Sequence, residues 1–145
     1  MIAFDTNVLV YAHRRDSPFF AEASEAVRRC AEGKDAWAML WPCVHEFLAV
    51  VTNPKIFKTP TPMPVAVGQV EQWLSSPTVV LVNEEAGYWS HFSELCVGAK
   101  ISGAKVHDAR VAALARFHEL ELLSADRDFT RFPGLDVRNP LHPRR

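Results

Sequence analysis

The sequence predicts an α/β domain in which a mostly parallel central sheet of about five short strands is flanked by helices, giving three layers. Apolar runs of strand length alternate along the chain with longer segments whose apolar residues have helical spacing. A helix between successive strands is typical of parallel sheets that are covered on both faces. The chain has 145 residues, of which 48% are hydrophobic, enough for one domain with its own core. We therefore expect residues 1–145 to form a single domain.

The expected strands and helices alternate from the first residues onward. The strands are residues 2–4, 36–41, 78–82, 120–126 and 134–140. The helices are residues 5–14, 19–33, 43–53, 65–76, 84–100 and 106–120. The segment TNPKIFKTPTPMP is crowded with prolines, and apolar patterns continue on both sides of it, so we expect a loop within the domain.

Capping residues and prolines indicate where the helices begin and end. Thr6 or Asn7 is the expected cap of the first helix. Ser17 and Pro18 are expected to open the second helix, because serine caps well and proline suits the first helical position. Two acids are expected to open the helix that begins at residue 84.

Four acidic residues are placed where strands end or helices begin. Asp5 directly follows the first strand, Glu46 lies about one turn into the helix after the second, and Asp126 directly follows the fourth. Asp108 lies at the start of the helix before the fourth strand and joins the others if that helix begins beside the same edge. Parallel sheets bind ligands outside the carboxyl ends of their strands. We therefore expect these acids to converge there.

Carboxylates brought this close together repel one another and need protons or a cation. Because no cysteine or histidine is placed as a ligand, the oxygen donors suit Mg²⁺ or Mn²⁺ rather than zinc. Thr6, Asn7 and Ser124 offer neutral oxygens that orient the acids or the metal-bound waters. Taken singly, Asp5 also fits a helix cap, and Asp126 a turn residue.

Composition limits the location and the partners of the chain. The net charge is −1, which argues against an attraction to nucleic acid spread over the whole surface but leaves a local basic patch possible. Three widely spaced cysteines are typical of a reducing compartment, and Asp5 and Asn7 interrupt the first apolar stretch. We therefore expect a cytoplasmic protein without a membrane span.

Basic residues and a histidine lie near the acids in the sequence. The candidates for contacts with phosphate groups lie next to the acids or in the proline-rich loop, and they are Arg110, Arg127, Lys55 and Lys58. His107 is interpreted as a surface or capping residue.

The motifs FDTNVLVYA, VHEFLAVVTN, HDARVAALA and LLSADRDF, together with TNPKIF and FPGLDVRNPL, resemble those of PIN-domain ribonucleases, specifically VapC toxins. The resemblance implies a PIN-like fold and an acidic quartet at Asp5, Glu46, Asp108 and Asp126, with Ser124 as a polar partner and Asp128 as an extra acid. It also implies cleavage of structured RNA, either tRNA or ribosomal RNA, with Mg²⁺ or Mn²⁺. The implied partners are a VapB-like antitoxin and a second copy of the chain.

Two other classes of function stay open at this point. A phosphatase resembling the haloacid dehalogenases also carries an aspartate at a strand end, but it requires a second acid two residues later, where this chain has Asn7. The second alternative is a non-catalytic module that binds RNA or an antitoxin and holds a structural ion. If an antitoxin binds, we expect it to cover the apolar helices around residues 8–11 and 47–51.

Overall fold

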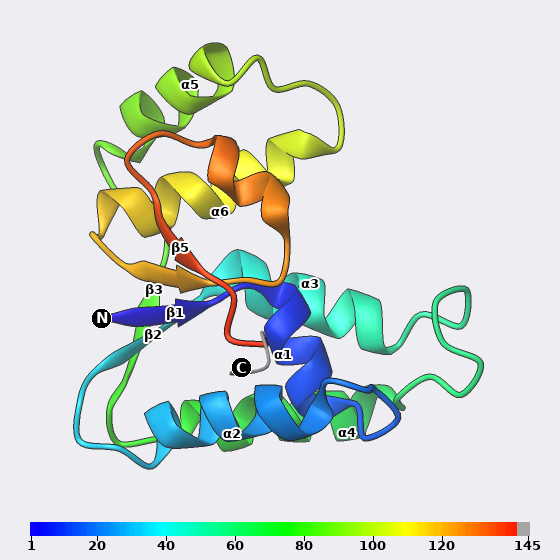
Figure 1. Cartoon of the computed structure of the whole chain (residues 1–145). Coiled ribbons are helices and arrows are strands. Elements are labelled where there is room, and N and C mark those ends of the chain that lie inside the picture. Colours follow the sequence, from blue (N-terminus) through cyan, green and yellow to red (C-terminus); the bar gives the residue numbers. More distant parts are fainter. Residues whose placement is uncertain (142–145) are drawn as a thin grey trace.

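A five-stranded parallel sheet lies at the centre of the chain in the computed structural model, which describes residues 1–141 (Figure 1). The strands are β1 (Ile2–Phe4), β2 (Trp37–Leu40), β3 (Val79–Val82), β4 (Glu121–Leu123) and β5 (Asp136–Arg138). Their spatial order is β3-β2-β1-β4-β5, and every neighbouring pair is parallel. The predicted fold class is confirmed. The single domain over residues 1–145 stays a prediction, since its last four residues lie outside the described part.

Helices cover both faces of this sheet. They are α1 (Thr6–His13), α2 (Phe20–Ala31), α3 (Trp41–Val51), α4 (Met63–Leu74), α5 (Tyr88–Gly98), α6 (Lys105–Phe117) and a 3₁₀ helix, η1 (Arg127–Arg131). Helices α5 and α6 pack together on one side of the sheet, while α2 and α4 lie on the other side (Figure 1). Within residues 1–141, no helix is long and apolar enough to cross a membrane.

The strand order places a ligand site between β1 and β4. From β1 the chain moves to β2 and β3 on one side, and then returns to β4 and β5 on the other. Where the direction of winding reverses, the loops after the two adjacent strands diverge to opposite faces and leave a crevice at their carboxyl ends. Asp5 follows β1 and Ser124 follows β4 at this point, and the Asp5 amide donates to the Leu123 carbonyl at 2.9 Å.

The core lies between the sheet and its helices. Phe4 on β1 packs against Trp37 on β2 in an edge-to-face arrangement, with ring centroids 5.9 Å apart. Helix α6 is buried around most of its circumference, and most of its buried residues are small, namely Ala109, Val111, Ala112, Ala113, Leu114 and Ala115. Small side chains let this helix approach the sheet closely. The position of α6 matters for function, because its first turn carries Asp108.

Several predicted boundaries differ from the structure. The second strand ends at Leu40 rather than at residue 41, because Trp41 and Pro42 already form the first turn of α3. Proline fits there, since a first-turn amide has no partner within the helix. Helix α2 begins at Phe20, and the Ser17 hydroxyl accepts from the amide of Phe19 instead of capping the helix itself.

The expected caps of two other helices are also corrected. Asp5, rather than Thr6 or Asn7, caps α1. Helix α5 begins at Tyr88, after Gly87 in the left-handed region with φ of 94°, so Glu84 lies outside it. A backbone in that region strongly favours glycine, and it separates the acidic segment from the helix.

Candidate active site

Asp5 lies at the crevice between β1 and β4 and is almost completely buried, with 7% of its surface exposed. One carboxylate oxygen, Oδ1, accepts from the amide of Thr6 at 2.8 Å. The other, Oδ2, accepts from the Ser124 hydroxyl at 2.8 Å. We refer to the sheet edge at the carboxyl ends of the strands, with Asp5, Glu46, Asp108 and Asp126, as the acidic edge. Asp5 is therefore both a helix cap and one of the acids of this edge, so both interpretations of this residue apply.

Burial raises the pKa of Asp5 to about 6. The hydrogen bonds from Ser124 and the Thr6 amide oppose this rise, whereas the negative charges of Glu46 and Asp108 add to it. A carboxylate in this position is costly to ionise without a nearby cation. The electrostatics of the crevice thus favour a bound positive charge.

Ser124 joins the ends of the two central strands. Its side chain is buried, with 2% exposed, and its hydroxyl donates to Asp5. Its oxygen accepts from the amide of Asp126 at 3.0 Å and from the Asn7 side chain at 3.4 Å. The Asn7 carbonyl oxygen in turn accepts from the amide of Ala125 at 3.3 Å. Asn7 and Ser124 thus fix the two acids relative to each other, whereas Thr6 contacts Asp5 through its backbone amide.

Three carboxylates meet beside this pair of strands. One carboxylate oxygen each from Asp108, Asp126 and Asp128 lies within 4.8 Å of the others. Asp126 also caps η1 by accepting from the amide of Asp128 at 2.8 Å. Oxygen donors at this spacing fit a hard divalent cation. The helix that carries Asp108 does begin beside the acidic edge.

A lysine provides positive charge to this cluster. The ammonium group of Lys105 forms an ion pair with Asp128, and its Nζ lies 3.7 Å from Asp108 Oδ2. Lys105 holds the pKa of Asp128 below its usual value. Burial and the charge of Asp126 raise the pKa of Asp108, although Lys105 opposes that rise. This role of Lys105 is not among the predictions from the sequence, although the spacing of three residues between Lys105 and Asp108 on one helix is a signal for it.

Glu46 stands slightly apart and pairs with a histidine. It forms an ion pair with His107, and this contact lowers the pKa of Glu46 and raises that of His107. Glu46 still lies close enough to raise the pKa of Asp5 and of Asp108 by its charge. The interpretation of His107 as a surface or capping residue misses this pair, which depends on α3 and α6 lying side by side.

The four candidates for phosphate contacts differ in their surroundings. Arg110 forms an ion pair with Glu84, so its charge is already neutralised. Arg127 is exposed on η1, next to the acids. Lys55 and Lys58 are exposed in the loop between α3 and α4, and neither takes part in an ion pair within residues 1–141. These last three keep a free positive charge.

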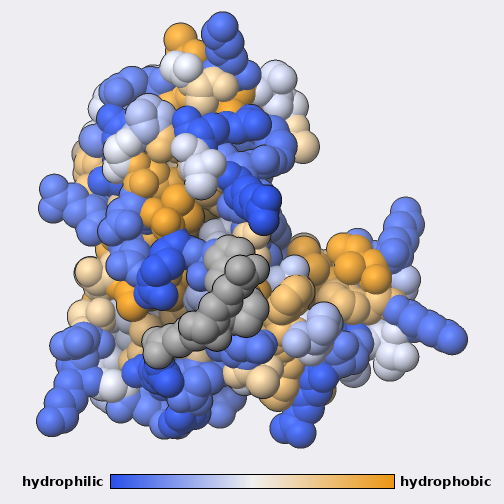
Figure 2. Space-filling model, in the orientation of Figure 1, coloured by the Kyte–Doolittle hydropathy of each residue, from blue (hydrophilic) through white to orange (hydrophobic). Residues whose placement is uncertain are grey.

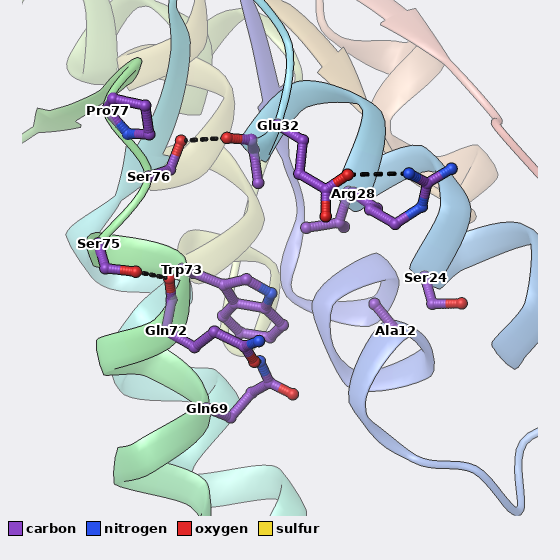
Figure 3. Close-up of a pocket in the computed structure, with 12 residues that line it drawn as sticks. Ala12, Ser24, Arg28, Glu32, Gln69, Gln72, Trp73, Ser75, Ser76 and Pro77 are labelled. Atoms are coloured by element: carbon purple, nitrogen blue, oxygen red, sulfur yellow. Dashed lines mark hydrogen bonds and ion pairs between the residues drawn. The ribbon is translucent and has the colours of Figure 1, made fainter.

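A separate groove of about 420 Å³ lies between α2 and α4, away from the acids (Figure 3). Trp73 and the amides of Gln69 and Gln72 line one wall, while Ala12 and Ser24 line the other side. None of the four quartet acids contributes to it. The groove mixes apolar and amide groups and is therefore suited to a peptide rather than to a metal.

Replacing Ser124 with alanine is expected to weaken metal binding about tenfold, because a ligand that loses its hydrogen-bonded support is less well oriented. The same change removes a donor to the buried Asp5 carboxylate. The midpoint of a Mn²⁺ titration, followed by the melting temperature, measures the effect. Thr130→Ala is the matched control, since that hydroxyl donates to the Arg127 carbonyl on the exposed side of η1. Equal midpoints for Ser124→Ala and the wild type would contradict the assignment.

Comparison with known proteins adds three findings. The model of the PIN domain family matches residues 2–135. Ribonuclease VapC48 of Mycobacterium tuberculosis is 38% identical over 138 residues, covering 94% of this chain and 95% of the relative. Ribonuclease VapC43 of the same species is 33% identical over 141 residues, covering 97% and 96%.

Solved structures share the fold at lower identity. VapBC2 from Rickettsia felis, bound to a DNA fragment from its promoter, aligns with a TM-score of 0.70 at 19% identity and covers 96% of this chain and 98% of that one. Mycobacterium tuberculosis VapC20, described as a toxin that cleaves the sarcin–ricin loop, aligns at 0.67 and 16% identity, covering 93% and 98%.

Proposed function

This chain belongs to the PIN domain family, and we propose that it is a metal-dependent endoribonuclease that acts as the toxin of a type II toxin–antitoxin system. The observation that supports this most directly is the convergence of acids from β1, α6 and the β4–η1 connection at one sheet edge. Relatives that span nearly the whole chain are named ribonucleases. We place the protein in the cytoplasm, in keeping with its three free cysteines.

We assign the metal site to the acids of this edge. Asp5, Asp108 and Asp126, with Glu46 and Asp128 beside them, would hold Mg²⁺ or Mn²⁺. When bound, such an ion lowers the pKa of a coordinated water and stabilises charge on a phosphodiester during in-line attack. Ser124 and Asn7 keep the acids in place, and no side chain is required as a covalent nucleophile.

The positive groups around the acids suit a polyanionic substrate. Lys105 lies within the acidic cluster itself, and Arg127 is exposed beside it. Lys55 and Lys58 carry further unneutralised charge on the neighbouring loop. A basic rim around an acidic metal centre attracts a phosphate backbone while leaving the centre free to bind the ion. We propose structured RNA, either tRNA or ribosomal RNA, as the substrate.

The direct test is cleavage of RNA by the purified protein. Bulk tRNA and ribosomal RNA are incubated with increasing Mg²⁺ or Mn²⁺, and the new 5′ ends are mapped by sequencing. We expect defined cuts that depend on the metal and stop in EDTA. A phosphate monoester is the control substrate, and its hydrolysis without RNA cleavage would favour the phosphatase alternative. Absence of cleavage with tight RNA binding would favour the non-catalytic module.

The expected antitoxin surface on α1 and α3 stays a prediction. Val8, Phe47 and Val51 are completely buried, whereas Leu48 and Val50 are half-buried and Ala49 is exposed. A second candidate surface is the groove between α2 and α4, which is lined by Trp73 and by hydrogen-bonding amides (Figure 3). Structural neighbours include toxin–antitoxin complexes. We propose that a VapB-like antitoxin lays a helical or extended segment in this groove.

A long side chain placed across the groove between α2 and α4 is expected to weaken antitoxin binding by at least about tenfold. It would fill the groove and keep the antitoxin from contacting the apolar residues that line it. Ser24→Arg is suitable, since Ser24 lies on the α2 side of the groove. Ser90→Arg on α5 is the matched control: both serines donate to the carbonyl three residues earlier. Affinity for the co-purified product of the neighbouring reading frame is measured by calorimetry. Equal affinities for the two variants would move the antitoxin away from this groove.

We also propose that two copies of the chain form a homodimer. Large apolar side chains are exposed on α5 and on the edge strand β3, among them Trp89, Val97 and Leu81. A contact between two copies that covers these side chains would remove their apolar surface from water.

A further inference from the structure

The motif TNPKIF, which carries Lys55, forms a compact turn between α3 and α4. The side-chain oxygen of Asn53 accepts from the amide of Lys55 at 2.9 Å. The backbone carbonyl of Asn53 accepts from the amides of Ile56 and Phe57 at 3.1 Å each. Ile56 points outward with 54% of its surface exposed, whereas Phe57 is half-buried. We refer to residues 53–61 as the arm.

Arg14, at the end of α1, contacts the arm through its guanidinium group. The group lies over the Phe57 ring, 4.0 Å from the centroid. Its Nη1 donates to the Thr59 carbonyl at 2.8 Å and to the Thr61 hydroxyl at 3.3 Å. Its Nε and Nη2 donate to the two carboxylate oxygens of Asp16. The Arg14 side chain is only 11% exposed as a result. A lysine cannot reproduce this planar, forked arrangement.

The far end of the arm is fixed by a second set of contacts. The amide of Thr61 donates to the Val51 carbonyl at 2.8 Å. The Thr61 hydroxyl lies 3.1 Å from His13 Nε2, and His13 Nδ1 lies 3.1 Å from Gln69 Oε1. Because an amide oxygen only accepts, His13 Nδ1 donates to Gln69. The arm is thus a fixed feature of the surface rather than a free loop.

The arm lies on the same side of the molecule as the acidic edge. Asp5 caps the start of α1 and Arg14 caps its end, so the eight residues of the helix, about 12 Å long, separate the two. Helix α3 carries Glu46 and likewise ends at the arm. In Figure 1 the loop between α3 and α4 projects on the side toward which the strands point. Figure 2 shows the outline of the molecule hollowed between this projection and the part that carries α5 and α6.

The exposed side chains of the arm suit an RNA backbone. Lys55 and Lys58 form no ion pair in the part of the chain that the structure describes, and Ile56 stands between them in the sequence. Lysines held at fixed positions contact phosphates at a lower entropic cost than mobile ones. An isolated apolar residue between two free cations favours a polyanion over a protein helix, which needs a larger apolar surface.

We propose that Arg14 is a positioning residue that holds the arm as a docking site for the RNA backbone, away from the acids themselves. The inference rests on the proposed ribonuclease activity. Arg14 contacts the arm rather than the RNA, while Lys55 and Lys58 contact phosphates upstream or downstream of the cleaved bond.

The decisive variant is Arg14→Lys, which keeps the positive charge but removes the forked hydrogen bonds and the stacking on Phe57. We expect the KM for bulk tRNA to rise about tenfold, as for Lys55→Ala with Lys58→Ala, and kcat to stay within about twofold. Hydrogen exchange over residues 53–61 should become faster in Arg14→Lys only. Arg15→Ala, which removes a charge from the neighbouring exposed residue, is the matched control. A wild-type KM and exchange pattern in Arg14→Lys would overturn the proposal.

A binding measurement separates this inference from the proposed activity. Affinity for bulk tRNA in EDTA, followed by fluorescence anisotropy, needs no cleavage. Reduced affinity in Arg14→Lys and in the double lysine variant supports the docking role, even if the wild type cuts no RNA and the ribonuclease proposal fails. If the wild type cuts RNA and both variants bind tRNA normally but lose affinity for the antitoxin, the arm is a protein contact and the docking proposal is wrong.

Discussion

Replacing Asp126 or Asp108 with asparagine is expected to reduce metal-dependent RNA cleavage by at least about 100-fold, equivalent to a barrier some 3 kcal/mol higher. Each change removes a negative charge from the cluster of three carboxylates while keeping the size of the side chain. An amide binds a divalent cation more weakly than a carboxylate does. Initial rates on bulk tRNA, measured over a range of Mg²⁺ and Mn²⁺ concentrations, give the effect.

The same variants should lose their toxicity. Expressing the wild-type chain without a partner is expected to arrest bacterial growth, and the asparagine variants should permit it. Asp136→Asn is the matched control, since that exposed acid lies on β5 outside the cluster. Growth arrest by an Asp126→Asn protein that cuts no RNA would instead favour the binding module.

The structure also explains why the phosphatase alternative fails at Asn7. That alternative needs a carboxylate two residues after Asp5. The Asn7 side chain instead donates to Ser124 through its nitrogen and accepts from the amide of Ala125 through its oxygen. An ionised carboxylate has no hydrogen to donate, so aspartate would lose one of these bonds. The residue supports the crevice rather than taking part in a phosphotransfer.

The fold could be predicted from the sequence because its signals are local. Each expected strand contains the observed one, since short β-rich runs bounded by polar residues are distinctive. The predictions differ from the structure at the boundaries of strands and helices, where one residue fits the pattern of two neighbouring elements. Trp41 continues the apolar run of β2 but belongs to α3, and Asp5 is at once a strand end, a helix cap and a site acid. Such positions are decided by hydrogen bonds between segments that are distant in sequence.

The site could be predicted only in part. The positions of Asp5 and Asp126 follow largely from the parallel sheet, because Asp5 directly follows β1 and Asp126 lies three residues beyond the end of β4. The pairing of Glu46 with His107 and of Lys105 with Asp128 depends on how α3, α6 and η1 approach one another. The antitoxin surface stays a prediction for a related reason: an apolar helix pattern does not distinguish a face turned to the core from one left open.

The Asp5→Asn variant is expected to be more stable than the wild type without metal and less stable than the wild type with metal. The pKa of Asp5 is about 6 in the folded chain, against an ordinary value of 3.8. Below pH 3.8 the carboxyl is protonated in both the folded and unfolded states, and it costs nothing. As the pH rises from 3.8 to 6, the unfolded chain loses its proton first, so the wild type is progressively destabilised. Above pH 6 the full cost remains, at most roughly 3 kcal/mol.

Asparagine does not ionise, and it still accepts from the Thr6 amide. In EDTA at pH 7.5 the variant should therefore melt several degrees above the wild type, whereas at pH 4 the two should melt at similar temperatures. Saturating Mn²⁺ should raise the melting temperature of the wild type far more than that of the variant, because the ion binds the ionised carboxylate and stabilises only the folded chain. Differential scanning calorimetry with and without Mn²⁺ measures both effects. A variant that is less stable than the wild type in EDTA at pH 7.5, yet gains equally from Mn²⁺, would show that Asp5 supports the fold and does not bind the metal.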